Sequence, residues 1–184
     1  NVGKSKIETD ADLLKQLEAF LSKAEEVKGS NGTAFQFDNG VTLKLPKDQI
    51  VVDSIESPSV VKNVSIHEIP SDLMAVDIGK ETRKEMMREM PKFNTIYGNG
   101  PSGVYEKGFV KGTKAFAYGM QGAKSKGKFT MIGGGDIVAA FNKIFSPEQK
   151  SKMVNFESTG GGAGLEIIRT GGNMKTLKVL TQNI

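Results

Sequence analysis

Three times in the second half of this chain, a short apolar run ends in glycines and is followed by a helix-like stretch. Residues 95–97 run into 98–103, residues 129–132 into 133–136, and residues 154–156 into 159–162. Glycine lets backbone amides turn toward a ligand, and the helix that follows presents unpaired N–H groups and its positive dipole end to an anion. Three such loops at the spacing of βαβ units predict an anion site, most simply for phosphate. Tight turns without a ligand are the alternative explanation.

The glycine content marks these loops as the unusual feature of the chain. There are 22 glycines in 184 residues, whereas a background near 7% predicts about 13. The glycines of the three loops are Gly98, Gly100, Gly103, Gly133, Gly134, Gly135, Gly160, Gly161, Gly162 and Gly164. Because the excess is local, a generally flexible or low-complexity chain is excluded.

The remaining composition narrows the class of protein. The chain contains no cysteine, which excludes disulfides and thiolate metal sites and mildly favours the cytoplasm. No apolar stretch approaches the length of a membrane span, and residues 1–8 are polar, without the apolar core of a signal peptide. We therefore expect no membrane partner. Since the first residue is not methionine, we expect a fragment or a processed chain.

The net charge of +4 raises the question of nucleic-acid binding. The lysines that form a candidate stripe are Lys111, Lys114, Lys124, Lys126 and Lys128. They fall on the expected solvent side of a helix and on the turn after it, with few aromatic residues between them for base stacking. A solvated surface is the simpler interpretation, so no nucleic-acid partner is expected.

Apolar periodicity gives the expected elements of the first half. Helices are predicted over residues 10–28 and 80–90, and short strands over 33–37, 41–45, 50–53, 64–66 and 75–78. Asn39-Gly40, between the first two strands, is a strong signal for a two-residue hairpin turn. The hairpin is predicted to be a small insertion in the fold.

Strands and helices alternate in the second half. Strands are predicted over residues 94–97, 128–132 and 153–158, and helices over 108–122, 136–145 and 162–168. The pattern predicts an α/β fold: a three-layer Rossmann-like domain whose mainly parallel sheet has helices on both faces. In such a fold the ligand lies off the carboxyl ends of the strands. All three glycine loops should open at that edge.

Several motifs together resemble one known family. They are NGPSGVYE at residues 99–106, KGTKA at 111–115, IGGGD at 132–136, STGGGAGLE at 158–166, MAVDIG at 74–79 and LPKDQIVV at 45–52. Their residues, order and spacing are similar to those of phosphoglycerate kinase, and the resemblance covers roughly residues 4–165. The chain is thus identified as a divergent member of that family.

The resemblance implies the carboxyl-terminal, nucleotide-binding domain of a two-domain kinase. Such a kinase transfers a phosphoryl group reversibly between ATP and the carboxylate of 3-phosphoglycerate in glycolysis and gluconeogenesis, and hinge bending brings its domains together. Residues 1–184 would lack the first βαβ part of the domain and the whole amino-terminal, acid-binding domain. The resemblance therefore implies a cytoplasmic, monomeric parent enzyme, and a fragment that is inactive alone.

The family motifs also imply a set of nucleotide-binding positions. These are Ala75, Val76, Asn99, Pro101, Gly103, Val104, Glu106, Gly133, Gly134, Gly135, Asp136 and Ile137. The backbone amides implied for catalysis are those of Gly134, Gly135, Gly161 and Gly162. They would stabilise charge on the migrating phosphoryl group, which needs positioning and N–H donors more than covalent chemistry.

Two carboxylates in this set have competing explanations. Glu106 would accept hydrogen bonds from the ribose hydroxyls, but it would also serve as a cap for the helix expected near Gly108. Asp136 would hold the nucleotide's Mg²⁺, a cation that prefers oxygen ligands, but aspartate is also favoured at helix starts. A relative that binds a nucleotide or another anion without transferring phosphate is the alternative function.

The chain departs from the family pattern at several of these positions. Gly98 stands where tryptophan is usual, Gly164 replaces serine, Ile137 replaces a hydroxyl residue and Ala75 replaces glycine. Losing the hydroxyl at Ile137 removes one candidate contact to phosphate or to metal-bound water. The extra methyl of Ala75 lies beside the implied base site, which leaves the choice between adenine and guanine open.

Overall fold

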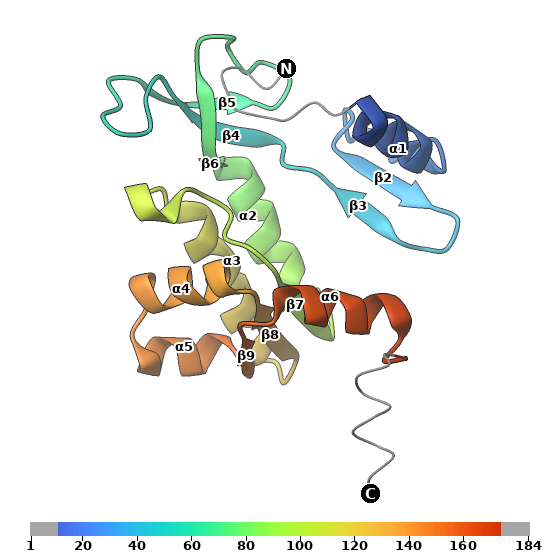
Figure 1. Ribbon diagram of the computed structural model, residues 1–184, viewed down its shortest axis with the longest axis vertical. Coiled ribbons are helices and arrows are strands. Elements are labelled where there is room, and N and C mark those ends of the chain that lie inside the picture. Colours follow the sequence, from blue (N-terminus) through green and yellow to red (C-terminus); the bar gives the residue numbers. More distant parts are fainter. Residues whose placement is uncertain (1–10, 174–184) are drawn as a thin grey trace, which may run out of the picture. The chain divides into compact units, whose positions relative to one another are not determined.

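The structure is a computed structural model that describes residues 11–173 (Figure 1). The chain divides into two compact units, Asn1–Thr82 and Arg83–Ile184, and each is described by itself. Asp10, the expected first residue of the first helix, and residues 174–184 lie outside the described part. The expected α/β fold class is confirmed, and its parallel sheet belongs to the second unit.

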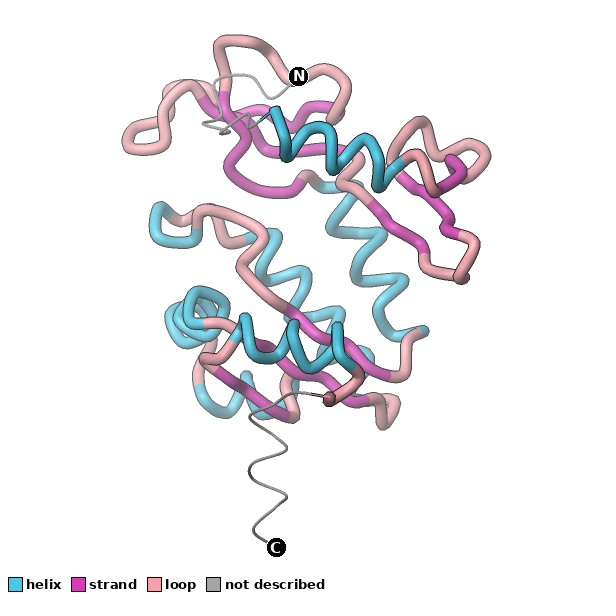
Figure 2. Tube along the Cα trace, turned by 45° about the vertical axis from the view of Figure 1, so that its right-hand side comes forward, coloured by secondary structure: helices cyan, strands magenta, loops and turns pink. Residues whose placement is uncertain are grey.

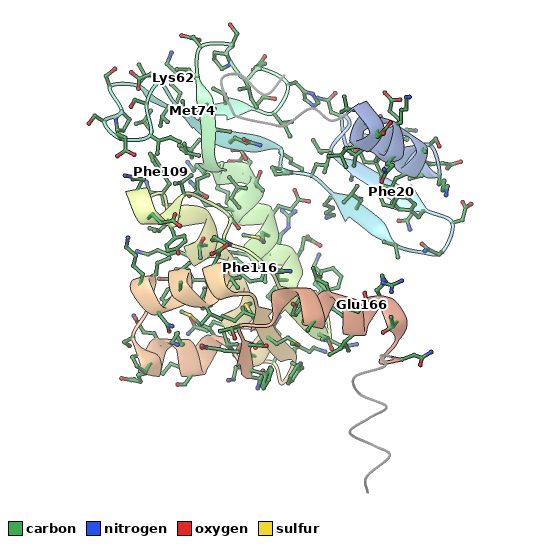
Figure 3. The ribbon with its side chains drawn as sticks, in the orientation of Figure 1. Phe20, Lys62, Met74, Phe109, Phe116 and Glu166 are labelled. Atoms are coloured by element: carbon green, nitrogen blue, oxygen red, sulfur yellow. The ribbon has the colours of Figure 1, made fainter. Side chains whose placement is uncertain are left out.

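The first unit opens with a helix on a small antiparallel sheet. Helix α1 (Ala11–Leu21) precedes β1 (Ala24–Glu26), β2 (Ala34–Phe37) and β3 (Thr42–Lys44), which pair in that order. Phe20 of α1, labelled in Figure 3, packs on Phe37 of β2, and the ring centroids lie 4.8 Å apart. The predicted hairpin is confirmed, with Gly40 at φ +83°.

The predicted helix over residues 10–28 is too long at its carboxyl end. Residues 24–26 form β1 instead, because their backbone pairs with β2 in the register Ala24↔Phe37 to Glu26↔Phe35. The apolar period continues through this segment, yet the long-range strand pairing overrides it. Sequence periodicity alone does not reveal a partner ten residues away.

A second antiparallel sheet completes the first unit. Strands β4 (Asp48–Val52), β5 (Val61–Ser65) and β6 (Met74–Ile78) have the order β5-β4-β6. Val51, Ile69 and Leu73 form its buried core. The three strands were expected from their apolar runs, but their antiparallel pairing restricts the parallel arrangement to the second unit.

Asp48 joins this sheet to the helix that follows, α2 (Lys80–Glu89). Its carboxylate accepts hydrogen bonds from the Glu81 and Thr82 amides, each at 2.9 Å, and from Asn63 Nδ2 at 2.8 Å. The carboxylate also lies directly against Gly79, where a Cβ would overlap it. The aspartate of the LPKD motif thus caps a helix that starts 32 residues later in the sequence.

The second unit is a three-stranded parallel sheet with helices around it (Figure 1, Figure 2). Its strands, in the order β7-β8-β9, are Thr95–Gly98, Phe129–Gly133 and Phe156–Ser158. Its helices are α3 (Lys111–Lys124), α4 (Gly135–Ile144), α5 (Pro147–Met153) and α6 (Gly161–Thr170), with short 3₁₀ turns η1 (Met90–Lys92) and η2 (Tyr105–Lys107).

The two faces of this sheet are covered by different helices, as expected. A Cβ on Gly98 would lie 2.5 Å from Phe116 of α3 and 3.3 Å from Ile137 of α4, so this face packs on α3 and α4 (Figure 3). Side chains alternate along a strand, and the neighbouring Tyr97 points to the opposite face, where its hydroxyl meets α6. The main core, including Ile132, Phe141 and Met120, lies on the first face.

Two boundaries in the second unit differ from the prediction. Helix α3 starts at Lys111 rather than near residue 108, because η2 precedes it and Gly108 takes a left-handed conformation at φ +87°. The strand expected over 153–158 is short because residues 147–153 form α5. Ser146 and Gln149 form a capping box at its start, a signal visible in the sequence.

Candidate functional site

The carboxyl ends of the parallel strands bring the three glycine loops to one edge of the sheet. Gly98 of β7 pairs with Ile132 of β8, and Gly133 of β8 pairs with Ser158 of β9. Parallel strands end on the same side, so the loops that leave them share this edge. The expected convergence of the loops is confirmed, and we call this edge the glycine rim.

Residues of all three loops are in contact at the rim. A Cβ added to Gly161 would lie 2.9 Å from the Cα of Gly134 and 3.3 Å from Asn99 Oδ1. A Cβ on Gly134 would lie 3.0 Å from the same Asn99 oxygen, and Gly134 has φ +122°. Separations below 3.0 Å do not occur for real Cβ atoms, so Gly161 must lack a side chain for the loops to approach this closely. Gly134 is required by its backbone conformation.

The two helices that start at the rim have open amino termini. Their N-cap residues are Gly134 and Gly160, and neither start receives a capping hydrogen bond from a side chain. Within residues 11–173, five first-turn amides of α4 and α6 donate no hydrogen bond: those of Gly135, Asp136, Ile137, Gly162 and Ala163. The Gly134 and Gly161 amides, also expected to be donors, instead bond to the Ser158 and Thr159 carbonyls. Open amides with aligned helix dipoles provide a site for an anion.

Asp136 lies at this open start, in the second position of α4, and is exposed. It does not occupy the N-cap position, so the helix-capping explanation is wrong for this residue. The described residues contain no group of three or more acidic, histidine or cysteine side chains that would hold a metal by themselves. One exposed carboxylate beside an anion site still suits Mg²⁺, which commonly keeps few protein ligands and takes the rest from phosphate and water.

The loop after β7 is held against α3 at its far end. The Ser102 amide donates to Oγ1 of Thr113, a buried side chain, at 3.2 Å. The chain then turns into η2, with the Tyr105 amide bonded to the Gly103 carbonyl at 2.8 Å, and this turn leaves Glu106 exposed. Since the N-cap of α3 is Val110, without a side-chain cap, Glu106 does not cap that helix.

Glu106 lines a hollow of about 350 Å³ in the second unit. The other lining residues are Tyr105, Gly108, Val110, Lys114, Lys143 and Ile144. The Lys143 ammonium donates to the Glu106 carbonyl at 3.2 Å and lies 5.8 Å from the centre of the Tyr105 ring. Partial burial, the charge and hydrogen bond of Glu106, and the charge of Asp136 raise the pKa of Tyr105 above its ordinary value.

Comparison with known proteins agrees with this geometry. The family model of phosphoglycerate kinase matches residues 1–171. The chain belongs to the phosphoglycerate kinase family. It is 39% identical over 169 residues to the phosphoglycerate kinase of Gloeothece citriformis, and 39% over 170 residues to that of Thermosynechococcus vestitus. Each match covers 91% of this chain and 38% of the relative, so the chain spans about two-fifths of the length of these kinases.

Solved structures of the phosphoglycerate kinase family share the fold. That of Coxiella burnetii phosphoglycerate kinase matches with a TM-score of 0.73 and 29% identity, covering 100% of this chain and 41% of that one. The Pyrococcus horikoshii enzyme matches with a TM-score of 0.66 over 98% of this chain and 40% of its own, at 21% identity, which supports the fold alone.

The phosphoglycerate kinase motifs divide between the two units. Ala75 and Val76 belong to β6 of the first unit, where Val76 is buried and Ala75 half-buried. The other expected site residues belong to the second unit. There Asn99, Gly134 and Gly161 touch at the rim, and Glu106 lines the hollow. The roles expected for all of them toward a nucleotide remain predictions.

Close packing limits the contacts that positions 98 and 137 can offer a ligand. The Ile137 side chain is 1% exposed and belongs to the core, so at this position only the backbone N–H is available to a ligand. Gly98 replaces the family's tryptophan where a side chain would collide with Phe116. The aromatic ring therefore reaches this space from α3 instead of from β7.

Sequence reasoning missed three residues of the second unit. Tyr105 and Lys143 line the hollow beside Glu106, and Tyr97 packs against the rim glycines. Tyr105 directly precedes Glu106 in the NGPSGVYE motif, so the sequence does carry a signal for its place beside that residue. Lys143 comes from the far end of α4, and only the folded chain brings it there. Lys114, interpreted as part of a solvated face, also lines the hollow.

None of the helices within residues 11–173 combines the length and apolar character that a membrane crossing requires.

Proposed function

We propose that this chain is the nucleotide-binding part of a phosphoglycerate kinase, which transfers a phosphoryl group reversibly between ATP and the carboxylate of 3-phosphoglycerate. The observation that carries the proposal is the glycine rim, where two open helix starts and Asn99 meet at one sheet edge. The amides of α4 and α6 are suited to bind the charged oxygens of ATP or ADP. Family membership supports the same function.

In this proposal, each part of the rim has a task. Because the amides of Gly134 and Gly161 already donate to backbone carbonyls, those of Gly135 and Gly162 orient the migrating phosphoryl group and stabilise its charge. These donors are fixed by the fold, so they need no reorganisation during the reaction. Asn99 adds a side chain that reaches both glycine loops. Pro101 keeps the loop after β7 stiff, which lowers the entropy lost on binding.

Asp136 is the residue we propose to hold Mg²⁺, which when bound would neutralise charge on the nucleotide phosphates. Its exposed carboxylate, next to open amides, leaves room for a phosphate-bound cation. The chemistry of the donor fits: magnesium prefers hard oxygen ligands. No other metal-binding role is proposed for the described residues.

Glu106 is proposed to bind the ribose. A carboxylate accepts hydrogen bonds from two neighbouring hydroxyls, and the hollow that it lines is of the size of small ligand pockets. Gly103 and Val104 would border the sugar and base in the same segment. Ala75 and Val76 of β6 would border the base.

The acid substrate, 3-phosphoglycerate, would bind to an amino-terminal domain that residues 1–184 do not contain. We propose that hinge bending in a monomeric, cytoplasmic parent enzyme brings the two substrates together. A further consequence is that residues 1–184 alone do not catalyse transfer. Steady turnover of ATP and 3-phosphoglycerate by this purified piece would contradict that part of the proposal.

The test uses the full-length protein with 3-phosphoglycerate, ATP and Mg²⁺. We expect phosphoryl transfer, and Asp136→Asn should reduce kcat far more than it reduces the melting temperature. Asp12→Asn, at an exposed position in the first turn of α1, is the matched control and should leave kcat unchanged. Binding of ADP without any transfer would instead identify a non-catalytic relative, and no binding of ADP or GDP would reject both.

A further inference from the structure

Tyr97 stands out among the residues near the rim because it lies outside the family motifs. It is the third residue of β7, and its hydroxyl donates to the carbonyl of Gly161, the first residue of α6, at 3.2 Å. The hydrogen bond spans 64 positions of the sequence and joins the first glycine-loop strand to the third glycine loop. Because a carbonyl accepts this bond, it does not occupy the open amides of Gly162 and Ala163.

The phenol ring lies in a slot that two glycines form. A Cβ on Gly133, at the end of β8, would overlap the Tyr97 hydroxyl, and one on Gly164 of α6 would lie 2.5 Å from it. Neither glycine has a positive φ, so the close approach of the ring explains them and backbone conformation does not. Gly164 stands where the family motif has serine, and that missing side chain makes room for Tyr97.

The tyrosine therefore connects β7 and the end of β8 to the first turn of α6. It belongs to β7, it covers the end of β8 at Gly133, and it holds the first turn of α6 at Gly161 and Gly164. The open amides of Gly162 and Ala163 lie between the two contacts on α6. A shift of the ring would move these donors relative to the α4 loop.

We propose that Tyr97 is a positioning residue of the rim: seated between Gly133 and Gly164, it sets the first turn of α6 for the binding of nucleotide phosphates. This inference rests on the proposed function, because it names what aligns the proposed phosphate donors. Tyr97 itself does not touch the phosphates. Its hydroxyl acts through the Gly161 carbonyl.

The first test is Tyr97→Phe in the full-length protein, which keeps the ring and removes only the donor. We expect the Kd for ADP with Mg²⁺ to rise about 2- to 10-fold, the range that one lost hydrogen bond gives. The matched control is Tyr118→Phe, on the exposed side of α3, where the ring contacts Phe145. It should leave the Kd unchanged. An equal effect of both substitutions on Kd would overturn the inference.

A second test separates positioning from general stability. Gly164→Ala places a methyl against the Tyr97 hydroxyl and should raise the Kd for ADP, whereas in a Tyr97→Ala background the same substitution should have little further effect. Residues in contact give such non-additive changes, and distant ones do not. Strictly additive effects on Kd would show that the pair does not act as a unit.

A third measurement needs no nucleotide, so it separates failure of this inference from failure of the proposed function. Amide hydrogen exchange at Gly161 and Gly164, whose amides donate to the Thr159 and Gly160 carbonyls, should quicken several-fold in Tyr97→Phe while exchange in α5 stays unchanged. If wild type fails to bind ADP but exchange quickens, the proposed function fails and the structural role of Tyr97 stands. If exchange and Kd both stay at their wild-type values, the inference is wrong.

Discussion

Two kinds of helix start lie within the second unit. Helix α5 begins with Ser146, whose hydroxyl accepts from the Gln149 amide, while the Ser146 amide donates to Oε1 of Gln149, and Pro147 fills the first position. Helices α4 and α6 begin with glycine and no cap at all. Helix α5 therefore satisfies its first amides with side chains, and α4 and α6 leave theirs open at the rim. Helix α3 also lacks a side-chain cap, but its start is not glycine.

This difference shows what the rim gives up. Glycine in place of a capping side chain costs about a few tenths of a kcal/mol of stability, and α4 and α6 carry that cost. Their glycines lose backbone entropy on folding as well. A ligand whose oxygens reach the open amides supplies the missing hydrogen bonds, and it stabilises the folded chain by mass action. Variants that add a cap to α6, or remove the cap of α5, test this interpretation.

The largest combined effect, on stability and on ADP binding, is expected for Gly161→Ala, which changes the rim directly. Its methyl would meet the Gly134 backbone at 2.9 Å, so we expect the free energy of unfolding to fall by about 1–3 kcal/mol. Displacing the loops should also weaken ADP binding at least about tenfold. Urea unfolding and ADP titration of the full-length protein measure the two effects.

The control for this variant is Gly162→Ala, one position along α6. A Cβ there meets nothing within 4 Å, and replacing a helical glycine by alanine stabilises by up to about 1 kcal/mol. The two neighbouring substitutions should thus change stability in opposite directions. Equal stability of both variants would show that the loops do not approach as closely as described.

The next effect concerns the remote cap of α2 in the first unit. Asp48→Ala removes the acceptor of the Glu81 and Thr82 amides, and we expect a loss of about 2–3 kcal/mol because the lost bonds are charge-assisted. Urea unfolding at pH 7 measures it, and Asp48→Asn is the isosteric control with a smaller loss. No change in either variant would contradict the capping role.

Asp48 also gives this cap a pH dependence. Burial acts to raise the pKa of Asp48, but hydrogen bonds from Thr82, Glu81 and Asn63 outweigh it and hold the pKa below its ordinary value. Because the folded pKa lies below the unfolded one, about 3.9, the stabilisation is complete above that pH and is lost as pH falls through the folded pKa. Asp48→Asn should flatten the fall in stability between pH 5 and about pH 2.

A smaller effect is expected where the closed helix start is opened. Ser146→Ala should lower the free energy of unfolding by about 1 kcal/mol and leave the affinity for ADP unchanged, since α5 starts away from the rim glycines in sequence and contact. Thermal unfolding and ADP titration measure the two. Ser151→Ala, an exposed serine inside α5 that does not cap it, should stay within about 0.5 kcal/mol of wild type.

The smallest stability change is expected where an open start is closed. Gly160 has φ −84°, which any residue adopts, and a Cβ there would lie 3.4 Å from Ser158 Oγ. Gly160→Asp supplies a capping acceptor and should add a few tenths of a kcal/mol. It should weaken ADP binding at the same time, because the carboxylate competes with phosphate. Gly160→Ala, without an acceptor, should leave affinity closer to wild type, and tighter binding by the aspartate variant would reject the open-amide explanation.

The sequence predicts the second unit well because its signals are local. Each apolar run leads directly into glycines and then into a helix, so strand, loop and helix are each marked by neighbouring residues. The convergence of the loops follows from parallel pairing alone. The same reasoning finds the hairpin at Asn39-Gly40, whose turn requires a left-handed glycine.

Other features depend on partners that are distant in sequence. The strand at residues 24–26 exists because β2 pairs with it, and the antiparallel sheet of β4 to β6 is not marked by periodicity. Helix α5 is a different case, since its capping box was readable. The slot around Tyr97 requires knowing that residues 97, 133 and 164 meet, which no local pattern reveals.

That slot also constrains how its residues can be exchanged during evolution. In this packing the Tyr97 hydroxyl occupies the space that a Cβ at position 133 or 164 would take. A side chain gained at either glycine therefore carries a cost unless the tyrosine moves or is replaced with it. We expect these three positions to change together within the family.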